Sequence, residues 1–368
     1  MTLEQIIGTA LVLLFLSDIF LTVLYARAGT GLLAPSWNRA IWTLLRAVAA
    51  LSGGRRGTIL SLAGPLIVVF LIGFWALGLT VGAALVIHPE LGTAIRPSSG
   101  QASSDFVTAL FVAGSSLSIV GGSDYAPHTA GTRMLFLVNS LIGGSVLTLV
   151  LSFLVQVYSA LRERNALALM IDLTTDGTGD AAQMLARLMP SGECGNASSE
   201  LGNLARSLAA TKEAHHFYPL LFYFSFEEPR YSLARFSFVL LDLVTLIETT
   251  LDRSRYVALI NSAAVTSLRQ GAFLLIETLD RIAPTADEGL TSAVEHERDR
   301  QSYIAATHTL AGAGIAVRQD GFELYIAARQ MWEPLALRVG AVLGYPIHDI
   351  DRRRHEVGQA NAFRTASN

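Results

Sequence analysis

The chain has 368 residues, of which 51% are hydrophobic and 15% are charged, and its mean hydropathy is +0.44. Soluble domains usually carry about 25% charged residues, so this composition argues against a wholly soluble protein and against a disordered one. The net charge of −3 argues against a nucleic-acid-binding surface. The single cysteine, Cys194, cannot form an intrachain disulfide and lacks the companions of a zinc site.

Three apolar stretches are long enough to cross a bilayer, which needs about 20 helical residues. They are Leu3–Tyr25, Thr58–Ile87 and Met134–Leu161. No basic residue precedes the first stretch, and its apolar run is too long for a cleavable signal peptide. We expect all three to be membrane-spanning helices.

The orientation follows from the arginines. The segment Ala26–Gly57 contains five arginines and no acidic residue, so it should face the cytoplasm. This places the N-terminus and the loop 88–132 outside, and everything after Leu161 inside. Within the basic segment, apolar residues from Trp37 to Val48 recur at helical spacing. They predict an amphipathic helix on the inner membrane surface, or one that packs on the C-terminal domain.

A shorter apolar segment lies between the second and third spans. Phe106–Leu117 has only a dozen residues, too few to cross a bilayer. It follows a loop rich in Gly, Ser and Pro, and it precedes Gly121 and Gly122. Non-helical backbone at membrane depth occurs where protein buries it or where it lines a water-filled cavity. The pattern predicts a re-entrant pore helix followed by a turn.

The residues after this segment read Ser-Ile-Val-Gly-Gly-Ser-Asp, followed by Tyr-Ala-Pro. This resembles the filter of potassium channels, which reads T-V-G-Y-G-D with a Pro two residues later. The resemblance covers Thr58–Arg164. The whole chain is similar to bacterial potassium channel-like proteins that have one extra N-terminal span and a helical cytoplasmic tail. The residues implied as the filter are Ser118, Ile119, Val120, Gly121, Gly122, Ser123 and Asp124.

The resemblance implies a homotetramer in a lipid bilayer that conducts monovalent cations, K⁺ above all, without a cofactor. The filter is nevertheless degenerate. Ile119 stands where the family has the threonine hydroxyl, Gly122 replaces the bracing aromatic, and Ser123 stands where the family has a glycine with positive φ. These departures leave the ion selectivity open. Asp124 matches the family's outer acidic residue, with a turn residue as the alternative.

Two further features lie within the spans. Gly143 and Gly144 stand where inner helices of such channels have a gating hinge, and close packing through small residues is the equal alternative. Asp18 is an intramembrane charge. We expect it to have a structural role, bonded to Thr22 or to an arginine of the basic segment.

Residues 165–368 show helical periodicity and no alternating strand pattern, which predicts an all-helical cytoplasmic bundle. No GxGxxG motif, metal-ligand spacing or nucleophile–base pair stands out, so we expect neither a nucleotide-binding domain nor an enzyme. The adjacent His215 and His216 do not chelate readily from one helix. The tail Asp351–His355 is expected to be solvated, with anionic lipid as the alternative partner. The predicted helical stretches are residues 201–226, Leu233–Leu251, Tyr256–Ile282 and Tyr303–Leu343.

The sequence thus predicts an all-α membrane protein with three regions. These are an N-terminal span with a basic linker (1–57), a pore domain of outer helix, pore helix, filter and inner helix (58–164), and a helical cytoplasmic domain (165–368). We expect a tetrameric cation channel of the bacterial inner membrane, gated by its cytoplasmic domain in response to an unidentified cytoplasmic ligand. The alternative is a non-conducting receptor or scaffold on a channel-like frame.

Overall fold

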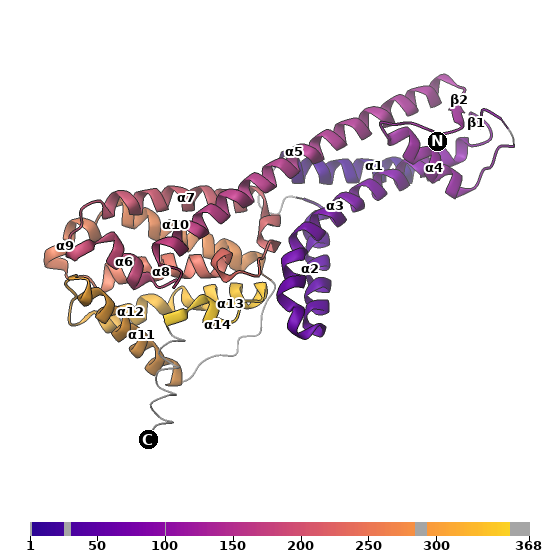
Figure 1. Ribbon diagram of the computed structural model, residues 1–368. Coiled ribbons are helices and arrows are strands. Elements are labelled where there is room, and N and C mark those ends of the chain that lie inside the picture. Colours follow the sequence, from indigo (N-terminus) through magenta and orange to yellow (C-terminus); the bar gives the residue numbers. More distant parts are fainter. Residues whose placement is uncertain (1, 26–30, 100, 284–292, 354–368) are drawn as a thin grey trace. The chain divides into compact units, whose positions relative to one another are not determined.

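The computed structural model describes residues 2–25, 31–99, 101–283 and 293–353, and these are mostly helical (Figure 1). The chain forms two compact units. Unit 1 comprises Met1–Leu44 and Pro65–Ser159, and unit 2 comprises Leu45–Gly64 and Ala160–Asn368.

The three predicted spans are confirmed as helices long and apolar enough to cross a membrane. They are α1 (Leu3–Ile19, continued by a π-helical turn to Leu24), α3 (Arg56–Ile87) and α5 (Ala130–Thr174). Helix α5 continues well past its predicted end at Leu161. Charged residues do not interrupt a helix, and α5 stops only where the backbone turns to positive φ, at Asp176 and Gly177.

Helices α1 and α3 pack closely because glycines lie at their contact. A Cβ on Gly8 would lie 2.6 Å from the carbonyl oxygen of Gly82, and a Cβ on Gly78 would collide with the ring of Phe15. Gly78 and Gly82 form a G-x-x-x-G pattern, the arrangement that lets helix backbones approach one another within a membrane.

Unit 1 also holds a short helix and two short strands. Helix α4 (Phe106–Leu117) packs on the end of α3 through a buried apolar cluster that includes Ile87, Ala109 and Val112. Strands β1 (Ile95–Pro97) and β2 (Tyr125–Pro127) pair antiparallel, with Ile95 opposite Pro127 (Figure 1). Each strand has only three residues, which is too short for the alternating pattern that identifies strands in a sequence.

Helix α2 (Ala34–Leu51) corresponds to the predicted amphipathic helix. Its exposed face carries apolar side chains, among them Leu44, Val48 and Leu51. This arrangement is typical of helices that lie on a membrane surface. Residues 26–30, including Arg27, lie outside the described part of the chain.

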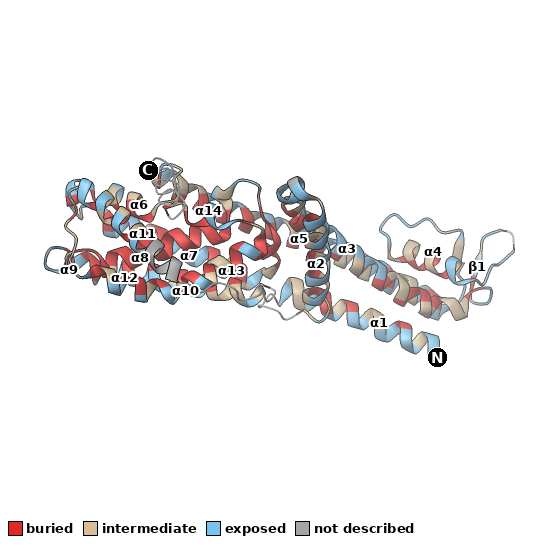
Figure 2. Ribbon diagram, turned by 90° about the horizontal axis from the view of Figure 1, so that it is seen from below, coloured by how far each residue is buried: buried red, intermediate tan, exposed pale blue. Residues whose placement is uncertain are grey.

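Unit 2 is a helical bundle built around α8 (Leu233–Thr249), which Figure 2 shows buried along its length. Helix α8 is apolar on almost every side, so neighbouring helices must cover it all round. The helices that pack most extensively on it are α6 (Ala181–Leu188), α10 (Ala263–Ile282), α12 (Gly321–Gln330) and α13 (Glu333–Leu343). The remaining helices are α7 (Ala197–Phe217), α9 (Arg253–Ile260), α11 (Ala293–Gly312) and α14 (Ile347–Ile350).

Two long predicted helices of this unit are broken. The stretch Tyr256–Ile282 bends by 68° between α9 and α10, because the Ser262 hydroxyl caps a new helix by accepting from the Val265 amide. Taken together, α9 and α10 also meet the length and apolarity of a span. The stretch Tyr303–Leu343 contains parts of three helices. The first break lies at Gly314, whose φ of +75° ends a helix.

Candidate functional site: a short helix, an exposed glycine turn and their supports

Helix α4 begins and ends at defined caps. The Asp105 carboxylate accepts hydrogen bonds from the Thr108 amide (2.9 Å) and the Thr108 hydroxyl (2.8 Å), which fixes the first turn. At the other end, the Ser118 amide donates to the Gly114 carbonyl and the backbone then becomes extended. The helix therefore stops after 12 residues, in agreement with the predicted segment.

The segment Ser118–Gly122 forms an exposed turn. Gly121 and Gly122 have φ of +64° and +125°, and the Val120 side chain is 91% exposed. Ser123, which stands where the family has a glycine, has no positive φ, and the two preceding glycines take the left-handed conformations that a serine adopts only at a cost. The Ser118 hydroxyl accepts from the Val120 amide (3.2 Å), so it is engaged within the turn.

The end of the turn is tied to the segment before α4. The Asp124 carbonyl accepts from the Ser98 amide (2.7 Å) and the Ser98 hydroxyl (3.0 Å). The Tyr125 hydroxyl accepts from the Ser103 amide (3.0 Å) and donates to its carbonyl (3.3 Å). Tyr125 thus supplies an aromatic brace three positions after Gly122.

The Asp124 side chain is exposed, and none of the hydrogen bonds among the described residues reaches its carboxylate. A turn residue would bond its own backbone. The arrangement therefore favours the interpretation of Asp124 as a free surface charge next to the glycine turn.

The paired glycines of α5 differ from one another. A Cβ on Gly143 would lie 1.8 Å from the Leu117 carbonyl oxygen at the end of α4, whereas nothing lies within 4 Å of a Cβ on Gly144. Gly143 is therefore explained by close packing, and Gly144 is left as the candidate for a hinge. One turn before Gly143, the buried Asn139 amide donates to the Ser116 hydroxyl of α4 (2.9 Å).

Asp18 has a structural role, but its partners differ from those expected. Its carboxylate accepts from the backbone amides of Leu33 (2.7 Å) and Ala34 (3.2 Å) at the start of α2. It also accepts from the Trp75 indole (2.8 Å) of α3. These neutral donors and the positive end of a helix compensate the charge. The Thr22 hydroxyl has no hydrogen-bond partner among the described residues.

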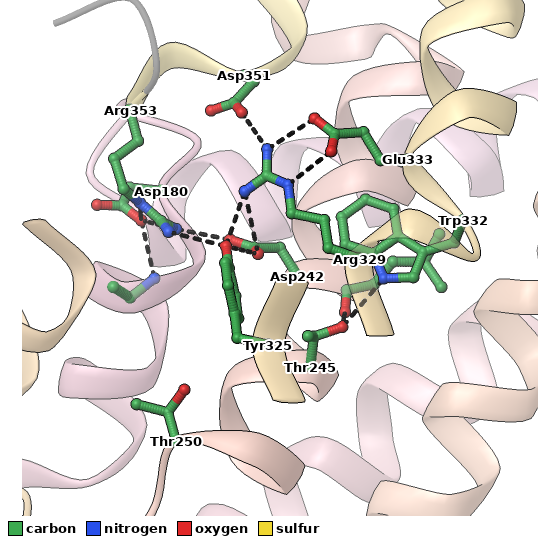
Figure 3. Close-up of polar contacts among 12 residues, drawn as sticks. Asp180, Asp242, Thr245, Thr250, Tyr325, Arg329, Trp332, Glu333, Asp351 and Arg353 are labelled. Carbon is green, nitrogen blue, oxygen red and sulfur yellow. Dashed lines mark hydrogen bonds and ion pairs between the residues drawn. The ribbon is translucent and has the colours of Figure 1, made fainter. Parts of the chain in front are cut away.

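Unit 2 contains a buried cluster of ionic side chains (Figure 3). Arg329 donates two 3.0 Å hydrogen bonds to Glu333, one of 2.7 Å to the Tyr325 hydroxyl, and another to Asp351. The Tyr325 hydroxyl donates in turn to Asp242 at 2.6 Å. Burial alone lowers the pKa of Arg329, but the surrounding carboxylates hold that pKa well above its ordinary value.

A second arginine joins the same cluster. Arg353 donates to Asp180 (2.6 and 2.9 Å) and to Asp242 (2.6 Å). Asp180 is the N-cap of α6, and Asp242 lies in the central helix α8. The cluster therefore joins the end of the described chain to the interior of the bundle.

This position corrects the expectation for the C-terminal tail. Asp351 and Arg353 are 3% and 7% exposed, so this part of the tail is neither solvated nor available to lipid. Each side chain finds an oppositely charged partner that compensates its burial. His355 lies outside the described residues.

Two further buried ionisable side chains of unit 2, Arg164 and His215, are bonded to backbone carbonyls. Arg164 is fully buried and donates to the carbonyls of Leu221 and Phe224, both at 3.0 Å. The His215 Nδ1–H donates to the Thr211 carbonyl at 2.9 Å, while its Nε2 has no partner in the described chain. Burial, followed by the nearby charge of Arg164, lowers the pKa of His215 to about 3. The ring is therefore neutral at physiological pH.

The sequence alone does not indicate several of the contacts that support these sites. The Asn139–Ser116 bond joins residues 23 positions apart, and no pattern marks it. The G-x-x-x-G pattern in the second span was a usable signal for helix contact.

The described residues contain no group of three or more His, Cys, Asp or Glu side chains placed to hold a metal ion. Comparison with family models, with curated proteins and with solved structures found no match to this chain.

Proposed function

We propose that the protein is a homotetrameric cation channel of the bacterial inner membrane, in which α4, the turn 118–124 and the first part of α5 form one quarter of a pore. The observation that carries this proposal is a 12-residue apolar helix that ends in an exposed glycine turn, among three helices long enough to span a membrane. Exposed backbone of this kind suits a water-lined path at membrane depth.

The electrostatics favour cations. The C-terminal end of α4 presents its free carbonyls, and the negative end of the helix dipole, to the turn. Asp124 adds a formal negative charge next to it, and four copies would form an acidic ring. The permeant ions in this proposal are monovalent cations, K⁺ among them.

The requirement for several copies follows from the number of pore segments. One turn per chain cannot enclose a path, and four turns around an axis can. In the apolar window of α5, 11% of the residues are buried within one chain, against 44% for α3. Neighbouring copies would cover part of this apolar surface.

In the proposed topology, the N-terminus lies outside and unit 2 lies in the cytoplasm. The acid-free arginine segment before α3 supports this orientation. Helix α5 contributes residues to both units. We propose that rearrangement of unit 2 acts on the gate through this helix, with Arg164 anchoring it among the carbonyls of the bundle.

A non-conducting receptor or scaffold is the alternative function. Ile119, which is 66% exposed, offers no hydroxyl to an ion, and Ser123 does not take the positive φ expected from the filter pattern. In this case unit 2 would retain a soluble partner, and the turn would carry no ions.

Ion flux into liposomes that contain the purified full-length protein tests the proposal. We expect flux of potassium or sodium, exclusion of a large organic cation, and lower cation flux for Asp124→Asn. Gly121→Ala should reduce flux strongly, because alanine tolerates a φ of +64° poorly. Gly131→Ala, at a helical position with open space, is the matched control. Absence of flux from confirmed tetramers, under all ionic conditions, would reject the channel in favour of the scaffold.

A further inference from the structure

Two residues of α5, one helical turn apart, hold the last turn of α4. The Asn139 side chain is 5% exposed, and its Nδ2 donates to the Ser116 hydroxyl at 2.9 Å. The Ser116 hydroxyl in turn donates to the Ala113 carbonyl at 2.8 Å. A polar side chain in an apolar helix is costly without such a partner, so the bond gives Asn139 a defined orientation.

The second contact involves backbone. Gly143 allows the Leu117 carbonyl to approach α5 so closely that any Cβ there would lie 1.8 Å from the oxygen. Asn139 and Gly143 are four residues apart and therefore face the same side of α5. Together they clamp α4 at Ser116 and Leu117.

The clamp lies directly before the turn. Ser118 follows Leu117 and begins the segment with the two positive-φ glycines. The other end of that segment is held by the bonds from Ser98 to the Asp124 carbonyl. The carbonyls between these supports are therefore positioned by α5 at one end and by the outer loop at the other.

We propose that Asn139 is a positioning residue for the pore: through Ser116 it fixes the start of the turn 118–124 and thereby sets the discrimination between ions. This inference rests on the proposed channel function. Discrimination by rings of backbone carbonyls depends on where those carbonyls lie. A looser last turn of α4 would shift them without removing the pore.

The experiment compares the full-length parent with Asn139→Ala, Ser116→Ala and the double variant in the same liposomes. Amide hydrogen exchange is measured over residues 113–124, and potassium and sodium fluxes are measured in parallel. Each single variant should raise the exchange by about fivefold, the loss expected for one buried hydrogen bond. The double variant should add little, because both substitutions remove the same bond. Ser140→Ala, at an exposed neighbouring position, is the matched control.

The outcomes separate the inference from the function on which it rests. Unchanged exchange in Asn139→Ala, or additive effects in the double variant, would overturn the positioning role whether or not ions flow. Raised exchange with an unchanged potassium-to-sodium flux ratio would overturn the link to ion discrimination. A parent without flux would reject the channel, while the exchange measurement would still decide whether Asn139 positions the turn.

Discussion

The isolated charge of Asp18 in unit 1 and the ionic cluster of unit 2 are compensated in different ways. In unit 1, Asp18 is fully buried and is compensated by two backbone amides and an indole, without a positive side chain among its described partners. In unit 2, Arg329 and Arg353 are surrounded by four carboxylates and a tyrosine. Neutral donors suffice for one isolated charge at a helix N-terminus, whereas a cluster needs charges of both signs.

The helices of the two units also pack on one another through different residues. Unit 1 brings α1 against α3, and α4 against α5, through Gly8, Gly78, Gly82 and Gly143. Unit 2 surrounds α8 with large apolar side chains, as a soluble core does. In lipid no hydrophobic driving force holds helices together, so close packing of their backbones through small residues stabilises the contact instead.

The largest expected effect tests the ionic cluster of unit 2. Asp242→Ala removes the partner of both Tyr325 and Arg353. We expect a loss of about 3–5 kcal/mol in the free energy of unfolding, because Tyr325 and Arg353 each lose a buried hydrogen bond to a carboxylate, worth about 1.5–3 kcal/mol apiece. Denaturant unfolding of the full-length protein in detergent, followed by helical circular dichroism, measures this loss.

Asp320→Asn is the matched control, because Asp320 pairs with Arg318 at 2.7 Å while its own side chain is 75% exposed. An exposed pair contributes little, so this variant should unfold as the parent does. Equal losses in the two variants would contradict the distinction between the buried cluster and the surface.

A smaller effect is expected for the isolated charge of unit 1. Asp18→Asn places an amide against the Trp75 indole, so two donors face each other. We expect a loss of about 1–3 kcal/mol from the unsatisfied buried group. Thermal unfolding in detergent measures it, with Trp75→Phe in the Asp18→Asn background as the partner variant. Restoration of part of the loss by Trp75→Phe would support the account, and a further large loss would oppose it.

The effect that is smallest near neutral pH is the pH dependence of stability. Because burial lowers the pKa of His215 from 6.5 to about 3, the unfolded chain binds a proton in this window that the folded protein does not. Stability should therefore fall as the pH falls below about 6.5, by at most about 1.4 kcal/mol per pH unit from this group. His215→Leu should reduce the pH dependence of thermal unfolding, and His216→Leu, at a partly exposed position, should not. The same pH dependence in parent and His215→Leu would contradict this assignment.

Apolar runs predicted the long helices of this fold well. The spans and α4 are each recognisable from length and composition, since a bilayer sets the length of a helix that crosses it. The ends were less predictable. Helix α5 extends to Thr174 because a charged sequence can remain helical. The N-cap at Ser262 begins a separate helix, although the apolar periodicity predicts one continuous helix there.

The candidate site was predictable only in part. The glycine turn and Asp124 could be located from the order of apolar and glycine residues, because these are local signals. The supports depend on pairs distant in sequence, such as Asn139 with Ser116 and Tyr125 with Ser103. A run of charges predicts a solvated tail, but Arg353 is buried against Asp242, a partner that only the fold brings to it.

The central claim is that the turn 118–124 lines an ion path, and thiol modification in planar bilayers tests it most directly. The variant Val120→Cys, with Cys194→Ser to remove the native thiol, is exposed to a positively charged thiol reagent during current recording. We expect the current to stop on modification. Leu77→Cys, at an exposed position of α3, should conduct unchanged. A current that persists when mass spectrometry shows every Val120→Cys thiol to be modified would contradict the claim.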